Sequence, residues 1–346
     1  MTAKKENPYT LSFGKEPLSF IQRDFQSDDI IESFLSNNPT YQVSMFTGVR
    51  GSGKTVALTN IANRIGKHKD WIVVNLNPER DLIKTLAAEL SNRKELLQLF
   101  KDAKINLSVF GLGLEISGTP SIMDEAVILR KMLKKLTEKG KKVLVTIDEV
   151  TPSKEFRIFA NQFQIFIREK LNIFLLMSGL YENIENLQNE KTLTFLYRSP
   201  KIELKPLNLS LIKKSYEDNL KVNKLEAKEM AIFTKGYAFA FQLLGYLCYK
   251  KHKKLKEVID DFDVYIEEYV YEKIWSECSE KDKKILSTLG EEPIKIEKIR
   301  KATKMKTNEI SVYRKRLMKK GLVTSSNYGE LELSLPRFKQ FIENNY

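Results

Sequence analysis

The segment from Gly48 to Thr55, which reads GVRGSGKT, constrains the fold of this chain more than any other stretch. A strand-like apolar run at residues 41–47 precedes it, and apolar residues with helical spacing follow it from Val56 to Ile65. The spacing G-x4-G-K-[ST] is typical of a loop whose backbone N–H groups surround a chain of phosphates. The strand before it and the helix after it make a chance match rare. The sequence therefore predicts a strand, a phosphate-binding loop and a helix.

The chemistry of this loop favours ATP with Mg²⁺ as its ligands. Glycines let the backbone wrap around a dense anion, and the N-terminus of the following helix offers further N–H groups to it. Lys54 is placed to reach the β- and γ-phosphates, and the Thr55 hydroxyl to bind Mg²⁺. The predicted nucleotide-binding residues of the loop are Gly48, Val49, Arg50, Gly51, Ser52, Gly53, Lys54, Thr55 and Val56.

A second acidic site is expected after residues 143–147, which are apolar and β-branched like a parallel strand buried on both faces. Asp148 would face the metal, and Glu149 would polarise the attacking water. An exposed acidic turn after an apolar strand is the alternative. Together with the glycine-rich loop, the pair favours a nucleotide-hydrolysing site.

Further strands are predicted at residues 71–76, 173–179 and 201–207, separated by helices. This alternation favours an α/β core with a parallel sheet, expected over residues 1–206. Ser178 ends one strand, where it would contact the γ-phosphate or the water, or merely terminate the strand. Arg198 precedes the last strand and would reach the nucleotide of a neighbouring subunit, or form a solvated or intramolecular ion pair.

Residues 207–276 lack strand alternation and predict a helical lid, with helices at 210–220, 225–233 and 239–250. Residues 277–346 predict a winged helix-turn-helix, with helices at 279–289, 294–302 and 307–320 and a hairpin of 322–324 with 330–335. The helix at 307–320 would be the recognition helix. Asn308 and Ser311 would meet base edges, while Arg314 and Lys315 would hold DNA phosphates. A protein-interaction or packing module is the alternative.

Taken together, the loop, the Asp148–Glu149 pair, Ser178 and Arg198 resemble the AAA+ class, within its archaeal-ATPase and replication-initiator-like branch, which borders the STAND ATPases. The resemblance implies a five-stranded core, catalytic roles for Glu149, Lys54 and Ser178, and an arginine finger at Arg198. It also implies that Phe20 and Ile21 pack on the adenine, with ordinary core packing as the alternative. At Gly236 to Ala238 the chain departs from the class, because the proline and the sensing arginine of the lid are missing.

Composition excludes several other classes of protein. Two cysteines and two histidines provide neither a disulfide framework nor a zinc site, and favour a cytoplasmic protein. The start of the chain has no signal-peptide pattern, and the apolar run at 237–249 is too short to span a bilayer. The net charge of +13 suits a nucleic-acid partner, although lysine spread along the chain also fits a general compositional bias.

Apolar and other residues alternate along residues 106–117, and this alternation predicts a hairpin.

Two functions remain open from the sequence. The first is an ATP-hydrolysing switch that self-associates and whose winged helix binds double-stranded DNA. The second is a slow or non-hydrolysing signalling ATPase whose winged helix binds protein. A small-molecule kinase is a poor third, because a winged helix would have no role in it.

Overall fold

The computed structural model describes residues 6–12, 14, 16–110, 124–290, 292–325 and 327–346. The chain divides into two compact units. The sheet unit comprises residues 24–47 and 57–203, and the helical unit comprises residues 1–23, 48–56 and 204–346. The predicted three-part division at 206 and 276 stays a prediction.

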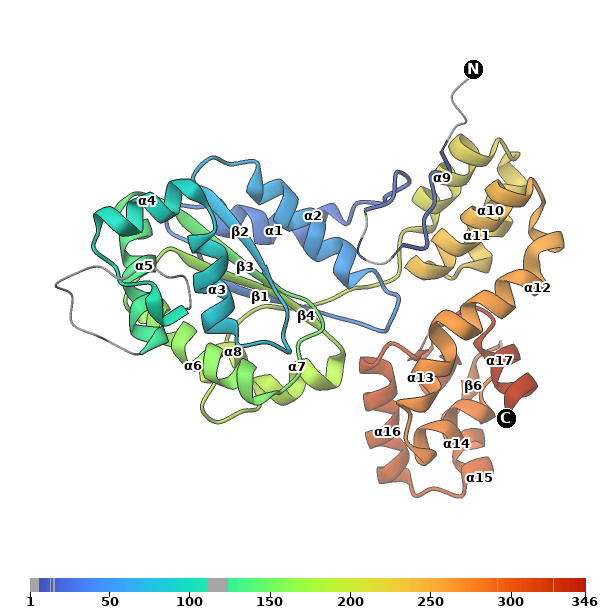
Figure 1. Ribbon diagram of the computed structural model, residues 1–346. Coiled ribbons are helices and arrows are strands. Elements are labelled where there is room, and N and C mark those ends of the chain that lie inside the picture. The colour runs from blue at the N-terminus through green and yellow to red at the C-terminus, as the bar shows by residue number, and fades with distance from the viewer. Residues whose placement is uncertain (1–5, 13, 15, 111–123, 291, 326) are drawn as a thin grey trace, which may run out of the picture. The chain divides into compact units, whose positions relative to one another are not determined.

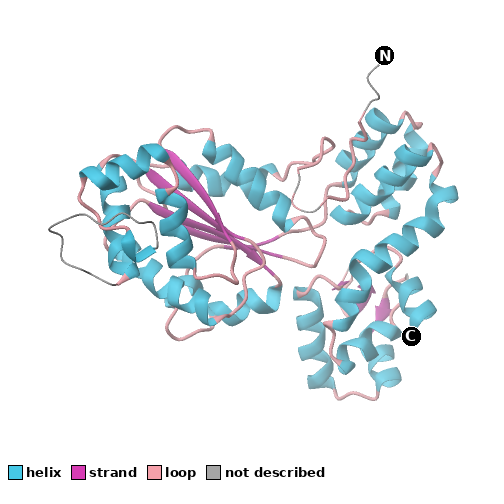
Figure 2. Cartoon of the chain, viewed as in Figure 1, coloured by secondary structure: helices cyan, strands magenta, loops and turns pink. Residues whose placement is uncertain are grey.

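The sheet unit contains five parallel strands, as predicted (Figures 1 and 2). Their order is β2-β3-β4-β1-β5, so the three central strands are flanked on both sides. Ile147 at the end of β3 lies opposite Met177 of β4, and Phe46 of β1 lies opposite Ser178. This register brings the carboxyl ends of β1, β3 and β4 to one edge. The strands are β1 (Val43–Thr47), β2 (Trp71–Leu76), β3 (Lys142–Ile147), β4 (Ile173–Gly179) and β5 (Lys201–Glu203).

Helices cover both faces of this sheet, because successive side chains of a strand point to opposite faces. On one face, Phe174 of β4 packs against Phe34 of α1, with ring centroids 5.1 Å apart. On the other, Leu175 of β4 joins the buried side chains of α3, α5, α6 and α7 in one apolar core. The helices of this unit are α1 (Asp24–Leu35), α2 (Lys54–Gly66), whose first residues belong to the helical unit, α3 (Leu82–Ser91), α4 (Lys94–Asp102), α5 (Glu125–Glu138), α6 (Lys154–Arg168), α7 (Tyr181–Gln188) and α8 (Thr194–Tyr197).

The hairpin predicted at residues 106–117 is wrong in its described part. Ser108–Phe110 forms a short 3-10 helix, not a strand, and Leu107 and Phe110 are buried in the apolar core of the sheet unit. Leu107 and Phe110 lie three positions apart, about one turn, so both side chains reach the core. Residues 111–117 lie outside the described residues.

In the helical unit, the three helices predicted for the lid are confirmed to within one residue at each end. They are α9 (Leu209–Leu220), α10 (Lys224–Phe233) and α11 (Ala238–Lys251). Asn208 and Asn223 cap α9 and α10, because their side-chain oxygens accept from the first N–H groups of each helix. The sequence prediction missed the helical stretch that follows, which is α12 (Leu255–Ile266), the π-helix η2 (Glu267–Tyr271) and α13 (Glu272–Ser276).

Residues 279–346, here called the C-terminal module, contain three predicted helices and a small antiparallel sheet of order β6-β8-β7. The helix expected to begin at Ile294 begins at Ile296, because Ile294 and Lys295 form β6 and pair with β8. A final helix, α17, was not predicted. The elements are α14 (Glu280–Thr288), β6 (Ile294–Lys295), α15 (Ile296–Thr303), α16 (Thr307–Lys319), β7 (Val323–Thr324), β8 (Glu330–Leu333) and α17 (Phe338–Asn345).

The N-terminal segment packs on the lid through Tyr9, which is 1% exposed. Its hydroxyl donates to the carbonyl of Ser215 at 3.1 Å, and its ring lies 5.6 Å from that of Phe241. A Cβ atom at Gly245 of α11 would lie 2.5 Å from the Tyr9 ring. The close approach of this ring therefore requires glycine at position 245.

We predict that Gly245→Ala destabilises the helical unit by about 1–3 kcal/mol, because the added methyl group overpacks the contact with Tyr9. Thermal unfolding followed by circular dichroism measures the effect. Gly290→Ala is the control, since the nearest atom to a Cβ there is a backbone nitrogen at 3.9 Å. Equal melting temperatures for both variants would contradict the prediction.

Candidate nucleotide site and C-terminal module

The glycine loop, residues 48–53, joins the end of β1 to the start of α2, as the motif requires. Gly51 and Gly53 have backbone φ angles of 74° and 90°, a region that side chains disfavour. A Cβ atom at Gly51 would also lie 2.1 Å from the Tyr237 hydroxyl oxygen. Two independent constraints, conformation and space, therefore explain the glycine at position 51.

Lys54 begins α2 and is only 8% exposed. Its ammonium group donates to the carbonyl oxygens of Gly48 and Val49, each at 3.0 Å, so it lies against the glycine loop. The Ser52 hydroxyl is buried without a hydrogen-bond partner among the described residues. A buried cation, an unpartnered hydroxyl and a helix N-terminus form a donor set that fits an anionic phosphate chain.

Residues of the lid hold the outer side of the glycine loop. The Tyr237 hydroxyl donates to the Arg50 carbonyl at 2.6 Å, and the Phe239 amide donates to the Gly51 carbonyl at 3.1 Å. The Arg50 side chain forms an ion pair with Glu277 at 2.9 Å. Sequence reasoning missed these residues because Tyr237 lies 187 positions from Arg50, and no local pattern indicates such a pairing.

The segment before the loop contributes a further contact. The Arg23 guanidinium donates to the Ser52 carbonyl at 2.9 Å and to the Lys205 carbonyl. Burial lowers the pKa of Arg23 to about 10, so it stays protonated at neutral pH. Phe20 and Ile21 are both half-buried, and Ile21 packs against the apolar core of the helical unit. Their contact with adenine stays a prediction.

In the sheet unit, Asp148 and Ser178 lie together at the carboxyl edge of the sheet. The buried Ser178 hydroxyl donates to the Asp148 carboxylate, and the Glu149 amide donates to the same oxygen at 3.0 Å. These two donors orient the carboxylate. Glu149 itself is exposed and has a φ angle of 53°, which is uncommon for a residue with a side chain.

The remaining predicted residues of the site are placed separately. Arg198 is exposed at the C-terminal cap of α8. Thr55, in the first turn of α2, belongs to the helical unit, whereas Asp148 belongs to the sheet unit. A magnesium site formed by both residues and an arginine finger at Arg198 therefore stay predictions.

The four candidate DNA-binding residues of α16, the predicted recognition helix, differ in how exposed they are. Asn308, Ser311 and Lys315 are exposed, and Arg314 is half-buried. The Asn308 side chain accepts from the Glu309 amide at 2.9 Å, and the Ser311 hydroxyl donates to the Thr307 carbonyl at 3.0 Å. These bonds leave the Asn308 amide NH2 able to donate and the Ser311 hydroxyl oxygen able to accept.

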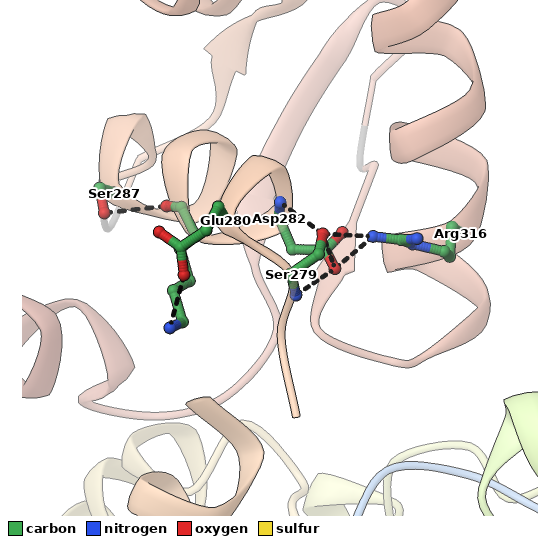
Figure 3. Close-up of polar contacts among 6 residues, drawn as sticks. Ser279, Glu280, Asp282, Ser287 and Arg316 are labelled. Atoms are coloured by element: carbon green, nitrogen blue, oxygen red, sulfur yellow. Dashed lines mark hydrogen bonds and ion pairs between the residues drawn. The ribbon is translucent and has the colours of Figure 1, made fainter. Parts of the chain in front are cut away.

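Two other basic residues of this segment turn inward instead. Asp282 of α14 has no exposed surface, and its carboxylate pairs with Arg316 (Figure 3). Lys320 lies 3.9 Å from the same carboxylate. The Ser279 amide also donates to the Asp282 carboxylate at 3.0 Å, so the same carboxylate takes part in the cap of α14. Arg316 and Lys320 thus pair with a buried carboxylate, which must be paired because an isolated buried charge is costly.

Burial by itself raises the pKa of Asp282, but the hydrogen bonds from Arg316 and Ser279 outweigh burial and lower it. The carboxylate is consequently charged at neutral pH. The ion pair joins α14 to α16 and determines how α16 is presented.

Other classes of site find no support in the described part of the chain. No group of three or more histidine, cysteine or acidic side chains there could hold a metal ion. Cys248 and Cys278 are buried free thiols, and burial raises their pKa values to about 12 and about 11. Among the helices of the described segments, none has the length and apolar character needed to span a membrane.

The comparisons with known proteins agree with this architecture. The ORC2 protein of Aeropyrum pernix in its ADPNP–ADP complexes aligns with a TM-score of 0.60 at 15% identity, over 96% of each chain. Its ADP form aligns with a TM-score of 0.50 at 14% identity, again over 96% of each chain. Cdc6p of Pyrobaculum aerophilum gives 0.49 at 15% identity and the same coverage. The chain therefore shares the fold of ORC2 of Aeropyrum pernix, in which an AAA+ type of core with a five-stranded parallel sheet is covered by helices.

A family model described as a domain of unknown function (DUF8462) matches residues 268–342, which include most of the C-terminal module. No curated protein matches the chain.

We predict that Asp282→Asn lowers stability by about 1.5–3 kcal/mol at neutral pH, because Arg316 loses a charged hydrogen-bond partner. The folded pKa of Asp282 lies below its unfolded value, so this contribution is present above about pH 4 and is lost as the pH falls through the folded pKa. The difference in melting temperature from the parent should therefore shrink in acid.

Glu280→Gln is the matched control for this measurement. It removes an ion pair with Lys283 on the same helix, but the Glu280 side chain is 90% exposed (Figure 3). We expect less than about 0.5 kcal/mol. A loss as large as that of Asp282→Asn, or a loss that does not depend on pH, would contradict the role given to Asp282.

Proposed function

We propose that the protein is an ATP-binding and Mg²⁺-dependent ATP-hydrolysing switch, whose nucleotide state controls DNA binding by the C-terminal module. The observation that carries the proposal is the glycine loop with the buried Lys54 ammonium at the start of α2. Support also comes from the fold shared with Aeropyrum pernix ORC2, a protein solved in ADPNP–ADP complexes.

Within this proposal the chain's residues divide the chemistry as follows. Lys54 and the amides of the glycine loop would bind the phosphates, and Thr55 and Asp148 would hold Mg²⁺, which would supply positive charge to offset that of the phosphates. Glu149 orients the attacking water, and its left-handed backbone fits a functional site, where strained conformations gather. Ser178 orients Asp148, and Arg198 acts on the nucleotide of a neighbouring copy, so that turnover depends on self-association.

The domain proposal keeps the core at 1–206, the lid at 207–276 and a winged helix at 277–346. The last assignment is supported by the order of helices and strands from α14 to β8. Asn308, Ser311, Arg314 and Lys315 would contact double-stranded DNA. A cytoplasmic location suits this role and the two buried free thiols.

A signalling ATPase with slow or no turnover, whose module binds protein, is the second candidate. The observation that favours it is that the lid has no arginine at Gly236 to Ala238 and that Tyr237 and Phe239 bond to the glycine loop itself. Turnover and DNA binding separate the two candidates.

We predict that Glu149→Gln binds ATP within about twofold of the parent but hydrolyses it about 10²–10⁴-fold more slowly, because the water loses its base.

Lys54→Ala should weaken ATP binding by about 10- to 100-fold, because a charge-assisted contact to the phosphates is lost. Isothermal titration calorimetry and phosphate release measure the two effects. Unchanged affinity in Lys54→Ala would refute the nucleotide site, and parental turnover in Glu149→Gln would refute the role of Glu149.

We predict that the affinity of the Glu149→Gln protein for duplex DNA differs between samples with ATP and Mg²⁺ and samples without nucleotide. We also expect this affinity to fall steeply as the salt concentration rises. Replacing Arg314 and Lys315 by alanine should reduce the slope of log K against log salt by roughly 1–2, because each phosphate contact contributes about 0.9. Lys301→Ala, an exposed change on α15, is the control. Binding that is absent, or indifferent to ATP, would favour the protein-binding alternative.

A further inference from the structure

We propose that Tyr237 is a positioning residue for phosphate binding: with the main chain of Phe239, it orients the peptide units of the glycine loop. The inference rests on the proposed function, because it assigns the lid a direct part in the same nucleotide site. The lid of this chain lacks the sensing arginine of the class, and its contact is instead made by Tyr237 to the backbone of the loop.

The geometry of the peptide bond supplies the argument. In a trans peptide the carbonyl and the N–H of the next residue point in opposite directions. Tyr237 holds the Arg50 carbonyl, and Phe239 holds the Gly51 carbonyl. Two successive carbonyls are therefore drawn toward the lid. The amide that shares the first of these peptide units, that of Gly51, is turned away from the lid and is available to an anion.

The lid residues that make these contacts are themselves held firmly. The Leu207 amide donates to the Gly236 carbonyl at 2.7 Å, and the Tyr237 amide donates to the Thr234 carbonyl at 2.8 Å. Gly236 has a φ angle of 73°, and a Cβ atom there would lie 2.6 Å from the Leu207 carbonyl oxygen. The turn that begins α11 thus presents Tyr237 in one position.

The state of the Tyr237 hydroxyl fits a donor. The side chain is 5% exposed, and burial raises its pKa far above the usual value, while the charge of Arg50 opposes the rise only in part. The phenol is protonated across the accessible pH range. Its hydrogen bond to the Arg50 carbonyl is consequently not a pH-sensitive contact.

Phosphate binding and the contact with the lid are coupled through this arrangement. A ligand that requires the oriented loop favours the bonded lid, and the bonded lid favours that ligand by the same factor. Arg50 and Glu277 extend the contact toward the C-terminal module, since their ion pair joins the loop to the residue two positions before Ser279. This ion pair is a second contact of Arg50, separate from the hydrogen bond that its carbonyl accepts from Tyr237.

The experiment compares Tyr237→Phe with Tyr216→Phe. Both remove one hydroxyl from a buried tyrosine of the helical unit, and Tyr216 donates to the Phe241 carbonyl at 2.9 Å, within the lid. We expect Tyr237→Phe to weaken ATP and ADP binding by about 5- to 10-fold, because an orphaned carbonyl lets the loop peptide turn. Tyr216→Phe should bind both nucleotides within about twofold of the parent. Calorimetric titration measures the affinities, and thermal melts confirm that both variants are folded.

The outcomes separate this inference from the proposed function. Loss of affinity in Tyr237→Phe alone, with melting temperatures of the two variants alike, supports the inference. Parental affinity in Tyr237→Phe, or equal losses in both variants, overturns it while the nucleotide site stands. If the parent protein binds neither ATP nor ADP, the proposed function itself fails and the inference fails with it.

Discussion

Hydrogen bonds from residues 237 and 239 to the carbonyls of Arg50 and Gly51 join the glycine loop to the lid. The loop follows β1 and leads into α2 of the sheet unit, yet it lies in the same compact unit as the lid. A loop that turns amides toward a ligand must find partners for its outward carbonyls, since buried carbonyls without partners are costly. Here the lid provides those partners, so the loop and the lid form one body.

The buried carboxylate of Asp282 imposes the second constraint, on the C-terminal module. It is fully enclosed and charged, so it must be paired, and it takes Arg316 and Lys320 from the basic residues of α16 and its end. Arg316 and Lys320 therefore point inward and join helices, whereas other basic residues of this segment, including Lys315, are exposed. The net charge of the chain therefore does not by itself show which basic side chains are exposed on the surface.

Much of the fold could be predicted from local patterns. Buried parallel strands require continuous apolar runs, and the runs at 71–76 and 173–179 became strands with those same bounds. The lid helices α9 to α11 were predicted from the lack of strand alternation, and the structure shows that asparagines cap two of them. The prediction failed where one sequence pattern is compatible with two kinds of secondary structure. Residues 106–110 alternate like a strand but fill the core from a 3-10 turn, and residues 294–295 continue a helical pattern but pair with β8.

The sequence alone determined the glycine loop, its place between a strand and a helix, and the acidic pair after β3, because these features depend on neighbours along the chain. Only the tertiary structure decided that Ser178 and the Glu149 amide orient Asp148, that Asp282 engages Arg316, and that Tyr237 holds the loop. Apart from the amide of Glu149, which adjoins Asp148 in the chain, each of these is a contact between elements far apart in sequence. Such partners are chosen by sheet register and by the packing of buried side chains, which no local periodicity encodes.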